Sequence, residues 1–273
     1  MNTRNKIKGL RFIASGLLLL SVLCANAQFT ETREFVKRFA IKPETHIDIT
    51  NKYGRIELNT WEKDSVVIKF RMEINEKKPI KLEKTMGNLD FDISNSQYYL
   101  VVKTLVDKNK SQLENEFQKF KETILQTNGS IRIDLTVWLP DNHELRLENK
   151  FGDIIMGDYK GETQISISNG KLKTGDLSKR STLNLNFADA VFGNLTNSRI
   201  TSNYSDIQVK NSGVLRLESK SSTVEIMNSE DLSIDSRRDK LRIRLADKID
   251  GVGSFTQFRI SEMKNKANIR LSY

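Results

Sequence analysis

A repeat with a short and nearly constant period constrains the fold of this chain more than any other feature of its sequence. Leu or Ile recurs at six positions separated by steps of 18, 18, 17, 17 and 17, and two more columns with these steps are apolar at eleven of twelve positions. A fixed period of this length is typical of solenoid proteins, in which each repeat packs only against its neighbours. The first column consists of Leu147, Ile165, Leu183, Ile200, Leu217 and Ile234.

Each repeat unit contains short strands. Apolar and polar residues alternate with period two, as in residues 145–148 and 215–218, and turn formers such as those at 168–170 lie between these runs. Stacking such units in parallel pairs their backbone groups and buries the apolar columns. We therefore predict an all-β fold, a single-chain parallel β-solenoid (β-helix) of about six coils over residues 145–250. The hexapeptide helix of acyltransferases is excluded, because the sixth residues after Leu147 and Ile165 are the charged Asp153 and Lys171.

The amino-terminal half contains the opening of one more coil. Residues 47–58 match residues 145–156 at an offset of 98, and both segments contain Asn-Lys-(Tyr/Phe)-Gly-x-Ile. Further strands are predicted at 66–74, 89–94, 98–106 and 131–139. Ser111 and Glu114 form a capping box, which predicts an amphipathic helix over 111–127 that caps the solenoid. We expect an irregular N-terminal β region over residues 28–140 and the solenoid with C-terminal strands over 141–273.

Residues 1–27 have the pattern of a secretory signal peptide. Four basic residues precede an apolar run over 12–23, which is too short to span a bilayer, and Ala25-Asn26-Ala27 fits a signal peptidase site. We predict cleavage before Gln28 and export to the periplasm, the outer-membrane surface or the medium, with no transmembrane segment in the mature chain. A lipid anchor at Cys24 is the alternative, but Leu23 is an unfavourable neighbour for it.

Composition excludes several kinds of chemistry. The chain has 2 His and 1 Cys, which argues against disulfide scaffolds and against metal sites built from these residues, and we predict no cofactor, no metal and no catalytic residue. Removing the four basic residues of the signal from 44 leaves 40 against 35 acidic residues, so the net charge falls from +9 to +5. This modest excess favours solubility over attraction to anionic lipid or glycan, and no nucleic-acid partner is expected.

Outward positions of the repeat supply the candidate binding residues. Arg199 and Arg216 lie one coil apart in one column, and Glu218 and Asp235 lie one coil apart in the next. The spacing predicts a basic stripe beside an acidic one, which a ligand could recognise. These four residues are our candidate binding site, and solvation of like charges is the simpler interpretation.

Carboxylates and histidines are weaker candidates. Asp153, Asp189 and Asp206 recur at corners, as carboxylates of a polysaccharide hydrolase would, but Asp at a turn usually bonds to its own backbone. His46 and His143 both precede a coil opening, which gives them equivalent places, and neither has a partner for metal binding nearby in the sequence.

Aromatic residues share a corner position of several coils. They could stack against sugars, although we expect them to pack the corner instead. They are Tyr53, Phe151, Phe187 and Tyr204.

The repeated phrase resembles a known family. Together with Trp138-Leu139-Pro140 and the short Asp-(Ile/Ala) corners, it is similar to the putative-adhesin β-strand-repeat family of exported bacterial proteins over residues 35–245. The resemblance implies a parallel β-helix and brings no catalytic residues with it. Our hypothesis is a non-enzymatic cell-envelope protein that presents its solenoid for adhesion or scaffolding to an envelope protein or glycan surface. The alternatives are a glycan-binding or polysaccharide-processing β-helix and an end-to-end polymer.

Overall fold

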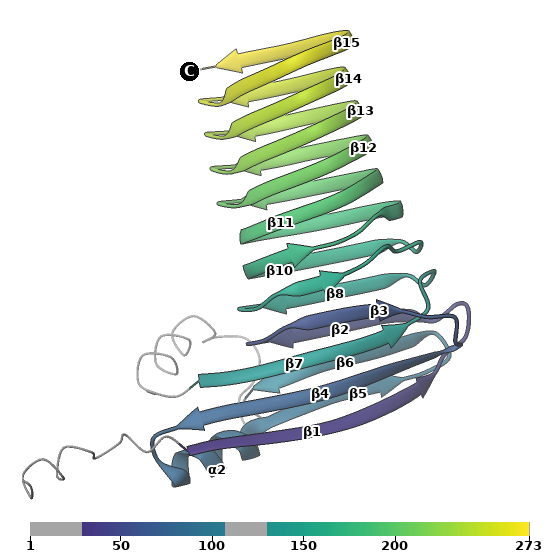
Figure 1. Cartoon of the computed structure of the whole chain (residues 1–273), viewed down its shortest axis with the longest axis vertical. Helices are drawn as coiled ribbons and strands as arrows, with labels where there is room; N and C mark the ends of the chain where they lie inside the picture. Colours follow the sequence, from purple (N-terminus) through teal and green to yellow (C-terminus); the bar gives the residue numbers. More distant parts are fainter. Residues whose placement is uncertain (1–28, 107–129, 273) are drawn as a thin grey trace, which may run out of the picture.

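The structure is a computed structural model that describes residues 29–106 and 130–272. It is a β-solenoid of about 8 turns, whose parallel coils of about 17 residues stack into a column above a broader N-terminal base (Figure 1). Strands make up 77% of the structure, which confirms the predicted fold class. The predicted signal peptide, Cys24 and the helix predicted at 111–127 lie outside the described residues.

The described chain contains fifteen strands and one helix, which follow one another in this order. They are β1 (Phe29–Ala40), β2 (His46–Lys52), β3 (Ile56–Thr60), β4 (Ser65–Glu76), α2 (Pro79–Asn88), β5 (Leu89–Asn95), β6 (Tyr99–Val106), β7 (Ser130–Leu139), β8 (Leu145–Lys150), β9 (Ile154–Met156), β10 (Thr163–Lys173), β11 (Leu177–Asn203), β12 (Asp206–Lys220), β13 (Thr223–Arg237), β14 (Lys240–Ser254) and β15 (Gln257–Ser272).

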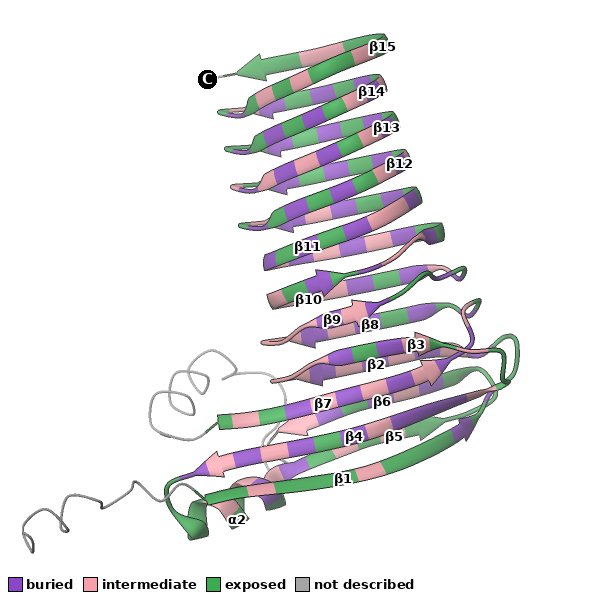
Figure 2. Ribbon diagram, in the orientation of Figure 1, coloured by how far each residue is buried: buried purple, intermediate pink, exposed green. Residues whose placement is uncertain are grey.

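The apolar columns stack in register. Ile165 pairs in parallel with Leu147 on one side and with Leu183 on the other, and all three side chains are fully buried. Each such side chain contributes about 1.5–3 kcal/mol relative to an exposed one. Polar residues alternate with them and face outward, so burial alternates along each strand (Figure 2). The predicted solenoid is confirmed, and it continues past residue 250 into β15.

The coil formed by β2 and β3 lies between two coils that follow it in the sequence. β2 pairs in parallel with β6 and β8, and β3 pairs in parallel with β7 and β9. The offset of 98 found in the sequence therefore relates directly stacked coils, with Ile47 beside Leu145 and Ile56 beside Ile154. After β7 the chain passes this coil and continues the column with β8.

The base is closed by antiparallel strands and α2. β1 pairs with β4, β4 with β7, and β5 with β6. Phe70 of β4 lies between Phe35 of β1 and Phe91 of β5, with ring centroids 4.6 and 4.5 Å away, so the aromatic rings connect these three strands. The four strands predicted here agree with the structure to within two residues at each end, whereas β1 and α2 are not predicted by the periodicity.

One corner of the coils places a residue in the left-handed region wherever the structure describes that corner. Eight non-glycine residues have φ between 50° and 63°; the last seven recur at steps of 17 or 18 residues, and the first precedes them by the offset of 98 that relates directly stacked coils. Such conformations are uncommon for bulky side chains. They are Tyr53, Phe151, Asn169, Phe187, Tyr204, Ser221, Arg238 and Phe255.

This corner explains the repeated Asn-Lys-(Tyr/Phe)-Gly phrase. The buried Asn51 donates through Nδ2 to the carbonyl oxygen of Ile133 at 2.9 Å, and Asn149 donates in the same way to Gly54 at 2.8 Å. A Cβ on Gly152 would lie 1.8 Å from the carbonyl oxygen of Gly54, so the backbones of successive coils approach too closely for a side chain. The phrase thus encodes a tight corner between stacked coils.

Later coils replace the glycine with a hydrogen-bonding side chain. Ser205 accepts a bond from the backbone N–H of Ala188 at 3.1 Å, Ser222 accepts from Ser205 at 3.2 Å, and Asp239 accepts from Ser222 at 2.7 Å. Thr256 continues the series by accepting from Asp239 at 3.4 Å. Each corner N–H of these coils therefore has a partner supplied by the next coil.

The opposite corner carries an amide ladder. Asn194 donates to Asp176 at 2.5 Å, Asn211 donates to Asn194 at 2.5 Å, and Asn228 donates to Asn211 at 2.7 Å. The two corners are therefore held by side chains that serve the fold, which leaves the outward positions of the strands available for other roles.

Candidate binding surfaces

Two outer surfaces follow from this architecture. We name the surface outside the column of Leu147, Ile165 and Leu183 the first face, and the surface outside the column of Ile154 and Leu172 the second face. Backbone pairing aligns the residues of successive coils on each face, so a side chain on one coil lies beside its counterpart on the next coil.

The four candidate binding residues lie on the first face. Arg199 pairs in register with Arg216, and Glu218 pairs in register with Asp235, so the structure brings each pair together. Arg199 Nη1 lies 3.4 Å from Glu218 Oε1, with both side chains about half exposed. Exposed ion pairs of this kind contribute little to stability, because solvent screens them. Their role in binding stays a prediction.

The three corner aspartates lie on the second face. Asp153 accepts a hydrogen bond from the backbone N–H of Lys171 at 3.0 Å, and its other oxygen lies 3.9 Å from Arg55. Asp189 and Asp206 are neighbours in register, and Asp189 lies 3.9 Å from the Lys171 ammonium. Asp153 therefore has a structural role, and Asp189 and Asp206 are exposed, with Asp206 on the wall of an open hollow of about 340 Å³ that Lys240 and Arg242 also line.

The two histidines do not occupy equivalent places, contrary to the expectation. The register that pairs Ile47 with Leu145 aligns His46 with Glu144, and His46 Nδ1 lies 2.9 Å from the Glu144 carboxylate. His143 is buried, and its Nδ1 lies 2.9 Å from the carbonyl oxygen of Thr45. The predicted equivalence of the two histidines is wrong by one residue. As a result, the His46 imidazole lies outside the coil and the His143 imidazole lies inside it.

Aromatic residues of the left-handed corner stack along the column. Phe187 and Tyr204 are nearly parallel, with ring centroids 5.0 Å apart, and Tyr53 and Phe151 stack at 5.6 Å. Phe187 is 59% exposed and Tyr204 51% exposed. We expected these rings to pack the corner, and this expectation is wrong for Phe187 and Tyr204. The two rings form an exposed aromatic edge instead.

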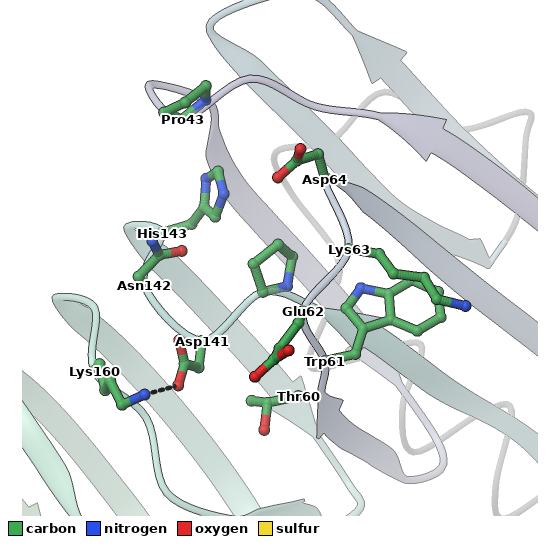
Figure 3. A pocket seen from close by; sticks show the side chains of 11 residues that line it. Pro43, Thr60, Trp61, Glu62, Lys63, Asp64, Asp141, Asn142, His143 and Lys160 are labelled. Atoms are coloured by element: carbon green, nitrogen blue, oxygen red, sulfur yellow. Dashed lines mark ion pairs between the residues drawn. The ribbon is translucent and has the colours of Figure 1, made fainter.

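A hollow lies where the base meets the column (Figure 3). It has a volume of about 530 Å³. Lys160 forms an ion pair with Asp141 at 2.8 Å on its wall, and the Lys63 ammonium lies 4.9 Å from the centre of the Trp61 ring. The Trp61 indole N–H donates to the carbonyl oxygen of Ser65 at 2.9 Å, so the side chains of Trp61, Lys63 and Lys160 have partners within the protein.

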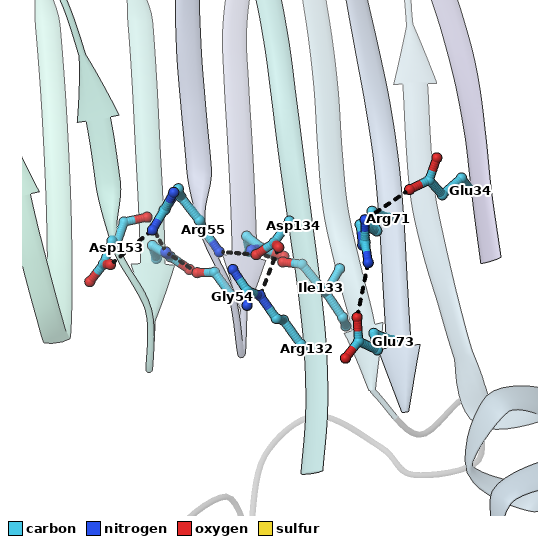
Figure 4. A network of polar contacts seen from close by, with 11 residues as sticks. Glu34, Gly54, Arg55, Arg71, Glu73, Arg132, Ile133, Asp134 and Asp153 are labelled. Carbon is cyan, nitrogen blue, oxygen red and sulfur yellow. Dashed lines mark hydrogen bonds and ion pairs between the residues drawn. The ribbon is translucent and has the colours of Figure 1, made fainter. Parts of the chain in front are cut away.

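Charged side chains on the second face of the base pair with one another (Figure 4). Arg71 contacts Glu34 at 3.4 Å and Glu73 at 3.1 Å, and Lys69 contacts Glu34 at 2.9 Å. The hydrogen bond from Lys69 lowers the pKa of Glu34 below its usual value. The charges of this region are compensated locally.

A row of cations on the second face of the C-terminal coils does not follow from the repeat period. The segment from Arg237 to Arg244 is dense in Lys and Arg, with a single acidic residue, and this density is the sequence signal that could have revealed it. Among the described residues, no cluster of His, Cys, Asp and Glu could hold a metal ion. In the same part of the chain, no helix is long and apolar enough to cross a membrane.

Comparison with known proteins identifies distant structural neighbours. No protein-family model and no curated protein sequence matches the chain. A structure from Parabacteroides distasonis named "putative lipid binding protein" has 11% identity and a TM-score of 0.38, over 89% of this chain and 97% of that one. A "putative cell adhesion protein" from Clostridium sporogenes has 9% identity and a TM-score of 0.27, over 86% and 100%. A "putative adhesin" from Bacteroides fragilis has 11% identity and a TM-score of 0.33, over 88% and 97%. The fold is established by the strand register of this chain.

Proposed function

We propose that this is an exported, non-enzymatic protein of the cell envelope that uses the outer faces of its solenoid for adhesion or scaffolding. The observation that carries the proposal is the flat, continuous and register-aligned surface of the column. About 8 coils at roughly 4.8 Å each, with strands of about six residues, give a face of roughly 40 by 20 Å. Such an area equals the roughly 800 Å² that one partner contributes to a stable protein interface.

The placement of the carboxylates supports a non-enzymatic role. Asp153 accepts a corner hydrogen bond, and the exposed side chains of Asp189 and Asp206 would leave a reacting group in contact with water. We expect no release of reducing ends when the purified protein is incubated with a panel of polysaccharides. Turnover that disappears on changing Asp153, Asp189 or Asp206 to Asn would contradict this part of the proposal.

Export is tested with the full chain in cells. We expect the protein outside the cytoplasm with Gln28 as its first residue, because the small residues Ala25 and Ala27 suit signal peptidase. Changing Ala27 to Arg should block cleavage and retain the longer form. A mature protein that begins at Cys24 would instead identify a lipid anchor.

Adhesion is tested by binding the purified mature protein to immobilised envelope fractions. We expect saturable binding that weakens when Arg199 and Arg216 are both changed to Gln, because guanidinium groups on a face steer and anchor an anionic partner. A control variant with Lys173 and Lys179 changed to Gln loses the same charge elsewhere on the column. Equal binding by all three proteins would remove the stripe from the proposal, and absence of saturable binding to any fraction would refute adhesion.

Glycan binding is a second candidate, favoured by the exposed edge of Phe187 and Tyr204. Two parallel rings that are more than half exposed offer apolar surface to the faces of sugar rings. Calorimetric titration with neutral oligosaccharides should show binding that is lost when both residues are changed to Ala and kept in Tyr204→Phe, which retains the ring. Retained affinity in the double Ala variant would exclude this edge.

A further inference from the structure

Cations form a straight row across the second face of the coil made by β14. Lys240, Arg242 and Arg244 alternate with the buried residues Leu241 and Ile243, so the three charged side chains face outward and are exposed. Alternate residues of a strand are about 6.7 Å apart, which places these three charges on a line of roughly 13 Å.

The row continues at the corner and on the next coil. Arg238 occupies the left-handed corner position directly before β14, with φ of 59°, and is exposed. Arg259 of β15 is exposed and pairs in register with Arg242. We name the set of Arg238, Lys240, Arg242, Arg244 and Arg259 the cationic row.

A single carboxylate neutralises part of this row. Glu225 pairs in register with Arg242, and its Oε1 lies 2.6 Å from Arg242 Nη1. The register neighbours of Lys240 are the uncharged Thr223 and Gln257. Among the described residues, the other four cations of the row form no ion pair, so the row retains a local excess of positive charge.

Some charges elsewhere on the column are compensated by the neighbouring coil. Arg180 pairs with Glu162 at 2.7 Å, and Lys171 lies 3.9 Å from Asp189. Like charges side by side on adjacent strands destabilise a sheet. Arg242 and Arg259 lie on adjacent strands, as Arg199 and Arg216 do on the first face, and Glu225 compensates only Arg242. An external anion would complete the compensation.

An exposed aromatic ring lies at the corner end of the row. Phe255 follows Arg238 in the column of left-handed corner residues, has φ of 52° and is 57% exposed. The equivalent corners of other coils hold Asn169 and Ser221, so the fold does not require an aromatic side chain at this position. The apolar ring of Phe255 lies beside a series of hydrogen-bond donors, a combination suited to a sugar that carries anionic groups.

We propose that the cationic row binds a linear acidic polysaccharide. Carboxylate or sulfate groups along the polymer pair with Lys240, Arg242, Arg244 and Arg259, and a sugar ring packs on Phe255 next to Arg238. A single-stranded nucleic acid fits less well, because its bases need aromatic platforms spaced along the cations, whereas the residues between them, Leu241 and Ile243, are buried aliphatic side chains. This proposal rests on the proposed function in one respect, namely that the acidic polysaccharide is the ligand to which the protein adheres.

The test uses the mature chain with dextran sulfate and polygalacturonate as probes and neutral dextran as the reference. A variant with Lys240, Arg242 and Arg244 changed to Gln should bind the acidic polymers about tenfold or more weakly, since three exposed charge contacts are lost. Its affinity should also depend less steeply on salt, because fewer ion contacts are screened. Arg242→Lys with Arg244→Lys keeps the charges and should retain most of the binding.

The matched control removes three charges from other places. Lys37, Lys173 and Lys179 are exposed and form no ion pair among the described residues, and their change to Gln gives the same net charge. This variant should bind like the wild type, with unfolding midpoints measured for all proteins. Four results would each overturn the proposal. The control variant could bind the acidic polymers as weakly as the row variant, or the row variant could bind them as tightly as the wild type. The wild type could also bind neutral dextran as tightly as the acidic polymers, or bind oligodeoxythymidylate more tightly than them.

The same variants separate this proposal from the proposed function. If the row variant loses polysaccharide binding but keeps binding to envelope fractions, the polymer is not the adhesion ligand and adhesion stands. If the wild type binds acidic polysaccharide but no envelope fraction, the cationic row stands as a polysaccharide site and adhesion fails.

Discussion

Changing Gly152 to Ala tests whether close contact between coils defines the corner. A Cβ at this position would lie 1.8 Å from the carbonyl oxygen of Gly54, whereas real Cβ contacts are essentially never shorter than 3.0 Å. The two coils must therefore separate locally until this contact lengthens from 1.8 Å to at least 3.0 Å. The carbonyl of Gly54 also accepts the 2.8 Å bond from Asn149 Nδ2, which the same movement would break.

The expected cost combines two effects. Overpacking a well-packed interior typically costs about 1–3 kcal/mol, and leaving a buried hydrogen-bonding group without its partner costs about 1–3 kcal/mol more. We expect the free energy of unfolding to fall by about 3–5 kcal/mol, a large part of the roughly 5–15 kcal/mol available to a protein. Urea unfolding followed by circular dichroism measures this difference.

Gly157 provides a control with the same chemical change. No atom lies within 4 Å of the Cβ that alanine would add there. Gly157→Ala should therefore change the free energy of unfolding by less than about 1 kcal/mol. If both alanine variants unfold at the same urea concentration as the wild type, the close approach of the corners is not what requires glycine.

Three further predictions concern stability. Burial raises the pKa of Asp239 above its usual 3.8, although the hydrogen bond from Ser219 acts in the opposite direction. The folded state therefore favours the protonated carboxyl group. The stability that this group contributes is fully present below about pH 3.8 and is lost as pH rises through the raised pKa. Urea titrations from pH 3 to 7 should show that the free energy of unfolding of the wild type falls relative to that of Asp239→Ser as pH rises. A difference that stays constant with pH would refute this prediction. Ser221→Gly should raise the free energy of unfolding by about 0.5–1 kcal/mol by relieving its left-handed conformation at φ 53°; a lower value would argue against strain. Gly87→Ala in α2 should stabilise by up to about 1 kcal/mol, since the added Cβ meets no atom within 4 Å, and thermal denaturation that shows a loss would contradict this.

The column could be predicted from the sequence because its information is local and periodic. Each coil must place an apolar side chain at the same point, so Leu147, Ile165 and Leu183 reveal the register directly. The base lacks this redundancy. β1 buries only Phe39 strongly, and its other residues are exposed or half-buried, so its sequence carries little alternation. The position of the β2–β3 coil between later coils depends on pairing with β6 and β7, which no local pattern encodes.

The candidate sites also divide into features that follow from the repeat period and features that do not. The register correctly placed Arg199 beside Arg216 and Glu218 beside Asp235, because outward positions follow the same period as the core. Equating His46 with His143 failed because one step along a strand exchanges inside for outside. The exposure of Phe187 and Tyr204 was also mispredicted. The repeat period specifies where a corner lies, but it does not specify whether the side chain there points into the coil or into solvent.

The two kinds of position in a solenoid are under different physical constraints, and this difference indicates where recognition takes place. Inward columns must match the coil above and below, so a change there affects the stack. Outward columns are constrained mainly by charge repulsion between adjacent coils, which a compensating partner such as Glu218 beside Arg199 removes. Where compensation is incomplete, as around Arg242 and Arg259, the fold tolerates repulsion between like charges, which an external anion would relieve. Binding of an external polyanion should therefore raise the stability of the C-terminal coils more than that of the base, an effect that hydrogen exchange resolves coil by coil.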